Sequence, residues 1–137
     1  MTKTYSGSCQ CGAVKYEVTG EFQRFFLCHC KRCRKDTGSA HGANIFLSPA
    51  SITWLSGGDK VRTYLVPDTR HSKSFCVECG SALPRTPEGQ PLIIIPAGSL
   101  DSAVDADIRP LGHIFLQFKA DWDDHLDEVP KFEALPG

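Results

Sequence analysis

The residues best suited to chemistry in this sequence are its cysteines, because they fall into three short groups. The chain has 137 residues and seven cysteines, spaced as Cys9-x-Cys11, Cys28-x-Cys30-x-x-Cys33 and Cys76-x-x-Cys79. Thiols one to three residues apart are well placed to hold one metal ion. Tetrahedral zinc takes four ligands in structural sites, but three protein ligands and an open position in catalytic sites. Seven cysteines therefore divide into a predicted set of four and a predicted set of three.

The two short pairs predict a structural zinc site with four ligands, which are Cys9, Cys11, Cys76 and Cys79. A glycine, Gly12 or Gly80, directly follows each pair, and turns around a metal-bound sulfur often need the positive φ that glycine adopts easily. Such a zinc would join the N-terminus to the middle of the chain and contribute roughly 10–16 kcal/mol of apparent binding free energy. The alternative is four free cysteines that pack as small apolar side chains.

The central group, Cys28, Cys30 and Cys33, predicts a second zinc with a vacant coordination position. If Cys28 and Cys30 end an extended strand, their side chains share one face and His29 points away from that face. A site with three thiolates can accept an exchangeable ligand and do chemistry. The alternative is that His41 or His71 supplies a fourth ligand, which would make this a second structural site.

A run of four basic residues surrounds Cys33, and it comprises Lys31, Arg32, Arg34 and Lys35. A zinc ion with three thiolates carries a net charge of −1, which these cations would offset while attracting an anionic substrate. We therefore expect substrate contacts from Lys31, Arg32 and Arg34. The alternative is an ordinary solvated face or a small nucleic-acid patch. His113 and His125 are expected to be structural or surface residues.

Composition is typical of one globular domain spanning residues 1–137. The net charge of −1 gives the whole chain no general attraction for nucleic acid. No apolar run approaches the roughly 20 residues of a membrane span, and the first residues lack the apolar core of a secretory signal. Grouped thiols without such a signal favour metal ligation in a reducing compartment, and we expect a cytoplasmic protein. The sequence leaves the oligomeric state open.

Strand patterns dominate the sequence. Ala13–Val18 alternates apolar and polar residues, which is typical of a half-buried strand. Further strands are expected at 24–28, 43–47, 52–54, 61–66, 73–76, 92–95 and 114–118. Short helical turns are expected at Lys31–Thr37, ended by Gly38, and around Asp121–Leu126. The fold class predicted is mostly β with short helical turns only, and metal staples would join distant strands.

Five segments together resemble the glutathione-dependent formaldehyde-activating enzyme family, which includes the domain of centromere protein V. They are SGSCQCGAVKYEV, CHCKRCRKDTGS, FCVECGSAL, PAGSLD and HIFLQFKADW. The resemblance implies a β-tent fold built on two zinc ions per chain. It assigns the structural zinc to the two short pairs and the catalytic zinc to Cys28, Cys30 and Cys33. The implied activity is that of a carbon–sulfur lyase, which joins formaldehyde to a thiol such as glutathione to give S-hydroxymethylglutathione.

Three functional hypotheses follow from these residues. The first is a zinc-dependent enzyme that acts on a thiol–aldehyde adduct, formed from glutathione and formaldehyde or from a related thiol. The second is a non-catalytic, zinc-stabilised binding module. The third is a thiol redox sensor or a metal store with a labile second site.

Overall fold

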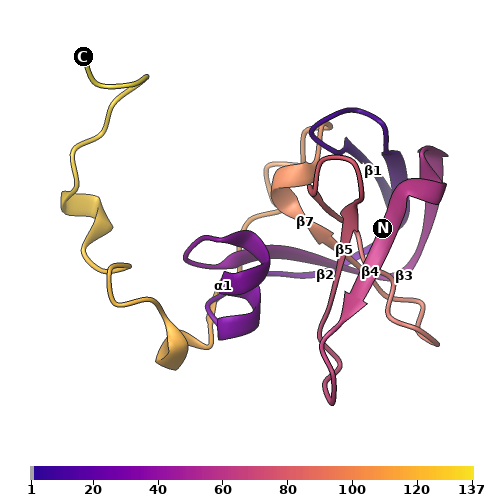
Figure 1. The fold of residues 1–137 in the computed structure, drawn as a ribbon, viewed down its shortest axis with the longest axis horizontal. Helices are drawn as coiled ribbons and strands as arrows, with labels where there is room; N and C mark the ends of the chain where they lie inside the picture. The colour runs from indigo at the N-terminus through magenta and orange to yellow at the C-terminus, as the bar shows by residue number, and fades with distance from the viewer. Residues whose placement is uncertain (1) are drawn as a thin grey trace.

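Two β-sheets make up most of the structure (Figure 1). The computed structural model describes residues 2–137. The first sheet contains β1 (Thr2–Ser8), β2 (Lys15–Cys28), β3 (Gly42–Ser56) and β7 (Ile93–Pro96) in that order, with β8 (Gly112–Ile114) parallel to the end of β2. The second sheet contains β4 (Val61–Leu65), β5 (Ser72–Cys76) and β6 (Ala82–Leu83). Within residues 2–137 the one α-helix is α1 (Lys31–Thr37). The prediction of a mostly β fold is confirmed.

The core forms on the inward-facing positions of β2, β3 and β7. Tyr16 and Val18 are fully buried, whereas Lys15 and Glu17 between them are exposed, as the alternation predicts. Leu47 and Ile95 pack against the same cluster from the neighbouring strands. Leu83 and Cys76 of the second sheet also belong to this cluster, so both sheets share one core.

The two longest strands were predicted as separate pieces. Residues 15–18 of segment 13–18 and all of segment 24–28 lie on the single strand β2, and segments 43–47 and 52–54 lie on β3. The β2–β3 register shifts between Gly20 and Phe22 and between Phe22 and Arg24, which breaks the sequence alternation without ending the strand. A Cβ atom on Gly20 would lie 2.5 Å from the Ala50 Cβ. This glycine therefore permits a close approach of strands rather than a turn.

Two predicted elements are wrong. Segment 114–118 leaves the strand after Ile114, the last residue of β8, because Phe115 has a φ of 57° and turns the chain into a 3-10 helix, η3 (Leu116–Phe118). Segment 121–126 is not a helix. It forms turns, because His125 has a φ of 50° and precedes another 3-10 helix, η4 (Leu126–Glu128). Both segments expose their large apolar side chains, so no packing face stabilises regular structure there.

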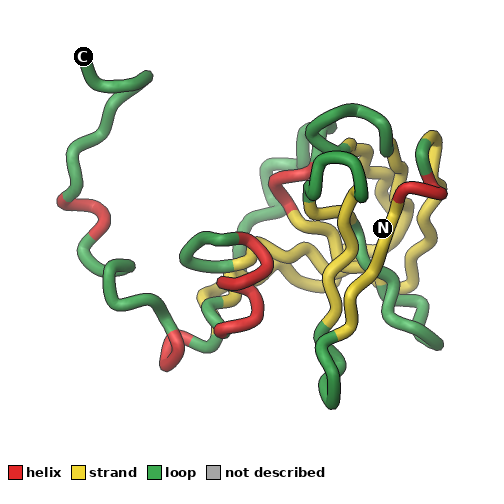
Figure 2. The backbone as a smooth tube through the Cα atoms, in the orientation of Figure 1, coloured by secondary structure: helices red, strands yellow, loops and turns green. Residues whose placement is uncertain are grey.

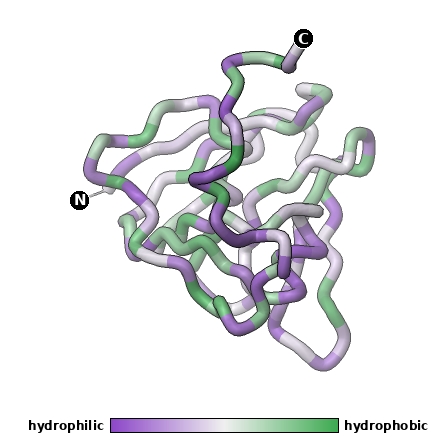
Figure 3. The backbone as a smooth tube through the Cα atoms, turned by 90° about the vertical axis from the view of Figure 1, so that its left-hand side faces the viewer, coloured by the Kyte–Doolittle hydropathy of each residue, from purple (hydrophilic) through white to green (hydrophobic). Residues whose placement is uncertain are grey.

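The segment after β8 runs away from both sheets (Figures 1 and 2). Figure 3 shows apolar positions recurring along it. Its exposed large apolar side chains include Trp122, Leu126, Val129, Phe132 and Leu135. Among residues 2–137, no helix has the length and apolar character needed to cross a bilayer.

Candidate metal centres and the cleft between them

The first candidate metal centre joins the β1–β2 turn to the end of β5. We call it the four-cysteine cluster, and it consists of Cys9, Cys11, Cys76 and Cys79. All four sulfur atoms lie within 4.8 Å of one another. Cys9 Sγ and Cys11 Sγ are 3.6 Å apart, far longer than a disulfide bond. Two sulfurs on one zinc, with bonds of about 2.3 Å, lie roughly 3.8 Å apart. This donor set therefore fits a zinc ion.

Local turns hold the four sulfurs in place. Gly12 and Gly80 have φ values of 79° and 77°, and their N–H groups donate to the Cys9 and Cys76 carbonyls at 3.1 and 2.7 Å. The positive φ predicted for these glycines is therefore confirmed. Hydrogen bonding to Ser81 lowers the pKa of Cys79 to about 5, with the larger contribution from the Ser81 side chain and the next from its backbone. Metal ligation needs the thiolate, so this environment favours the form that binds.

The second candidate metal centre lies where β2 ends and α1 begins. We call it the three-cysteine cluster, and it consists of Cys28, Cys30 and Cys33. Their sulfur atoms also lie within 4.8 Å of one another. Cys28 ends β2, and Cys30 is the N-cap of α1, with its sulfur accepting the Cys33 N–H at 3.4 Å. One short capped turn therefore brings three separate sulfurs to one point.

Burial and hydrogen bonding act differently on these three thiols. Burial raises the pKa of Cys28 and Cys33. Burial alone would also raise the pKa of Cys30, but hydrogen bonding to the Cys33 backbone and to Cys28 lowers it. Cys30 therefore gives up its proton most readily within the cluster.

The three-cysteine cluster has no fourth protein ligand among residues 2–137, since no histidine, aspartate or glutamate joins it. His71 Nε2 instead pairs with the Asp36 carboxylate. The His41 ring lies against His29, with centroids 5.1 Å apart. Neither His41 nor His71 therefore lies where it could serve as the fourth ligand of this cluster.

A cleft between α1 and the second sheet adjoins the three-cysteine cluster. Its narrow end is a cavity of about 40 Å³ lined by Cys33 and Asn44 on one side and by Leu83 and Arg85 on the other. The Asn44 amide points at Cys33 Sγ from 3.8 Å. A wider hollow of about 680 Å³ continues from it as far as Cys9. Residues lining both parts are Asp36, Thr37, Lys73, Ala82 and Pro96.

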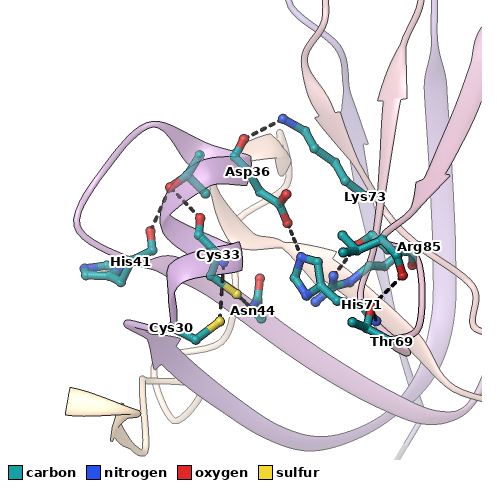
Figure 4. A network of polar contacts seen from close by, with 12 residues as sticks. Cys30, Cys33, Asp36, His41, Asn44, Thr69, His71, Lys73 and Arg85 are labelled. Atoms are coloured by element: carbon teal, nitrogen blue, oxygen red, sulfur yellow. Dashed lines mark hydrogen bonds and ion pairs between the residues drawn. The ribbon is translucent and has the colours of Figure 1, made fainter. Parts of the chain in front are cut away.

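Asp36 bridges this cleft. Its carboxylate accepts a hydrogen bond from His71 Nε2, and its backbone oxygen accepts one from Lys73 Nζ at 2.5 Å. Figure 4 shows Asp36 on the helix facing Lys73 and His71 on the opposite wall. The helix that carries Cys33 is therefore fastened to the sheet that carries Cys76.

Comparison with known proteins decides the family. The profile of the family described as glutathione-dependent formaldehyde-activating enzyme matches residues 4–118, which include both cysteine clusters. The chain belongs to this family. A Halomonas elongata protein, whose name assigns it to the same enzymes, is 34% identical over 131 residues, covering 85% of this chain and 77% of that protein. A crystal structure of a Rhodobacter sphaeroides protein shares the fold with a TM-score of 0.54 and 22% identity, covering 79% of this chain and 98% of that chain.

Three residues of the basic run, Lys31, Arg32 and Arg34, lie beside Phe118, which lines neither part of the cleft. Lys31 and Arg32 line a separate hollow of about 210 Å³ with Cys30 and Phe118. Lys31 Nζ lies 5.9 Å from the Phe118 ring centroid, and Arg34 donates to the Phe118 carbonyl at 3.0 Å. The role of these basic residues in attracting substrate stays a prediction. Lys31 and Arg32 lie beside Cys30, where that role would require them.

Three histidines form a group of their own, with ring centroids 5.0 to 6.2 Å apart, and they are His29, His41 and His113. His29 is buried, its Nε2 lies 2.8 Å from His113 Nδ1, and its Nδ1 lies 3.3 Å from the Asp123 carboxylate. Burial lowers the pKa of His29. These contacts join the end of β2 to β8 and to the C-terminal segment. His125 is exposed.

Sequence reasoning missed the residues of the cleft walls. Asp36, Asn44, Lys73 and Arg85 carry no spacing motif, and they meet only because β3, β5 and β6 pack around α1. The position of Arg85 after an apolar strand is a signal that its side chain is half-buried. Nothing in the sequence indicates which residues it contacts.

Proposed function

We propose that this protein is a zinc enzyme that joins a thiol to an aldehyde, with glutathione and formaldehyde as substrates and S-hydroxymethylglutathione as product. One observation carries the proposal, namely a cluster of three cysteines without a fourth protein ligand among residues 2–137, bordering a cleft. A tetrahedral site with three protein ligands has room for one more. Family membership supports glutathione and formaldehyde as the substrate pair.

Two zinc ions per chain fit the two cysteine clusters. The four-cysteine cluster would hold a structural zinc, and the three-cysteine cluster would hold the catalytic one. Zinc at the second site would lower the pKa of an entering thiol and keep it as a thiolate near neutral pH. A free thiol has a pKa near 8.5, so only a few per cent of it is thiolate at pH 7.

The chain's own residues would bind and orient the two substrates. Cys28, Cys30 and Cys33 fix the metal, and the narrow cavity beside Cys33 limits what can approach it. The thiol sulfur forms a bond to the formaldehyde carbon, and the carbonyl oxygen becomes a hydroxyl by taking up one proton. The proton lost by the thiol balances that uptake. In the reverse direction the carbon–sulfur bond breaks, which makes the enzyme a carbon–sulfur lyase.

One domain would carry this activity. Both sheets share one core, which supports a single domain spanning residues 1–137. All seven cysteines are free, and thiolates that bind zinc must stay reduced. We therefore place the protein in a reducing compartment, the cytoplasm.

The test is the rate at which the adduct forms. Glutathione and formaldehyde also combine without a catalyst, so exchange NMR must measure the interconversion of free glutathione and S-hydroxymethylglutathione both with and without zinc-loaded protein. We expect the protein to accelerate the exchange and Cys30→Ser to abolish the acceleration. An exchange rate equal to that without protein would contradict the proposal.

A second candidate function, a zinc-stabilised binding module, is favoured by the C-terminal segment. Trp122, Phe132 and Leu135 are exposed on it, and exposed apolar residues of this kind often contact protein partners. This function predicts that glutathione leaves the metal sites unchanged. It also predicts that any partner binds Cys30→Ser as well as the unmodified chain.

A further inference from the structure

Two cationic side chains in the cleft have no carboxylate partner among residues 2–137, and they support an inference that rests on the proposed function. Lys73 and Arg85 are half-buried and line the cavity next to Cys33. Within the described part of the chain, neither forms an ion pair with an aspartate or glutamate. Partly desolvated cations favour an opposite charge nearby. The cleft is therefore suited to an incoming anion.

The acidic residues that line the cleft already have other partners. The Asp36 carboxylate accepts a hydrogen bond from His71 Nε2. The Asp101 carboxylate, at the far end of the wide hollow, accepts one from the Ser8 hydroxyl at 2.6 Å. Neither carboxylate neutralises Arg85.

Arg85 also has hydrogen-bond donors to spare. A guanidinium has five N–H donors, and one of these, on Nη1, donates to the Ser72 carbonyl. Among residues 2–137 its side chain makes no other hydrogen bond. Lys73 uses one of its three donors on the Asp36 backbone oxygen. The planar guanidinium matches the two oxygens of a carboxylate.

The two walls of the cleft carry different chemical groups. Figure 4 shows Cys33 of α1 and Asn44 of β3 on one side of the cleft, and Lys73 and Arg85 on the other. We propose that Arg85, together with Lys73, binds a carboxylate of the thiol substrate, so that the site takes anionic thiols in preference to neutral ones. The sulfur lies at the three-cysteine cluster while the carboxylate lies across the cleft. This arrangement fixes the orientation of the substrate before the aldehyde arrives.

The experiment compares two thiols that differ in charge. Isothermal titration calorimetry of the zinc-loaded protein measures the Kd of glutathione and of glutathione diethyl ester, in which both carboxylates are esterified. We expect glutathione to bind about tenfold more tightly or better, as a charge-assisted hydrogen bond implies. Arg85→Gln should lower that ratio severalfold by weakening the binding of glutathione, while the ester binds as it does to the unmodified protein. Arg109→Gln, which alters an exposed arginine outside the cleft, should leave the ratio unchanged.

The ratio separates this inference from its alternatives. Equal binding of the two thiols to the unmodified protein, or an unchanged ratio in Arg85→Gln, would overturn the carboxylate site while leaving the thiol–aldehyde reaction standing. If neither glutathione nor its diethyl ester bound, the proposed function would be overturned as well. If Arg85→Gln does not fold, Arg85→Lys and Lys73→Gln supply the comparison, and each should lower the ratio in part.

Discussion

The two cysteine clusters contain the same ligand type but are built in opposite ways. The sulfurs of the four-cysteine cluster come from two segments more than 60 residues apart and from both sheets, with Cys9 and Cys76 buried in the shared core. The sulfurs of the three-cysteine cluster come from one strand end and one helical turn, six residues in all, beside a cleft. We expect long-range ligation to hold the fold together and local ligation to leave one side of the second metal site accessible.

Loss of the four-cysteine cluster should have the largest effect. Cys76→Ser removes a fully buried ligand, and structural zinc contributes roughly 10–16 kcal/mol, as much as a whole domain's stability. We expect a protein that does not fold, measured by circular dichroism and by soluble yield. A folded Cys76→Ser protein with both metals bound would remove the distinction between the clusters.

Loss of the three-cysteine cluster should spare the fold. In Cys30→Ser, the serine hydroxyl can replace the sulfur as N-cap of α1. We expect native secondary structure, one zinc ion in place of two by native mass spectrometry, and no rate acceleration. Cys76→Ser is the matched comparison. If Cys30→Ser unfolded while Cys76→Ser stayed folded, the two roles would be reversed.

The fastening of α1 to β5 should have an intermediate effect. Asp36→Ala removes the carboxylate that pairs with His71. The side chain of Asp36 is 24% exposed and that of His71 is 12% exposed. A charge-assisted hydrogen bond at a partly buried position contributes about 2 kcal/mol. We expect the free energy of unfolding, measured in urea, to fall by about that amount with both zinc ions retained. Asp107→Ala, at an exposed position, is the control, and equal losses from both variants would argue against the fastening.

The exposed basic residues should have the smallest effect. Arg32→Gln removes one solvated charge beside Cys30, and such charges typically contribute about 0.2–1 kcal/mol. We expect glutathione binding to weaken about twofold to threefold at low salt and the difference to vanish at high salt. Titration calorimetry at two salt concentrations measures this. A tenfold loss that persisted at high salt would make Arg32 a direct contact.

The sequence was sufficient to predict the fold class and the grouping of the cysteines into two clusters that could hold metal ions, because cysteine spacing and strand alternation are local signals. Cys28, Cys30 and Cys33 lie within one capped turn, and the alternation of Tyr16 and Val18 marks the core face of β2. Helix α1 was predicted with its bounds, since Gly38 ends it in the left-handed conformation. The β1 strand was missed because only Tyr5 and Gly7 among its residues are buried.

The cleft could not be predicted, because its walls are made by tertiary packing. Asp36 and His71 are 35 residues apart, and nothing in the spacing of either residue indicates the other. The error at Phe115 has a similar cause. A short apolar run has the composition of a strand, but its side chains here face solvent rather than a sheet partner.

Zinc K-edge X-ray absorption with and without glutathione tests the central claim most directly. Seven cysteines shared by two zinc ions give an average of 3.5 sulfurs per ion. We predict that value for the zinc-loaded protein alone and a rise to 4 when glutathione saturates it. Two ions fully ligated by protein atoms before glutathione is added, with no change afterwards, would contradict the account.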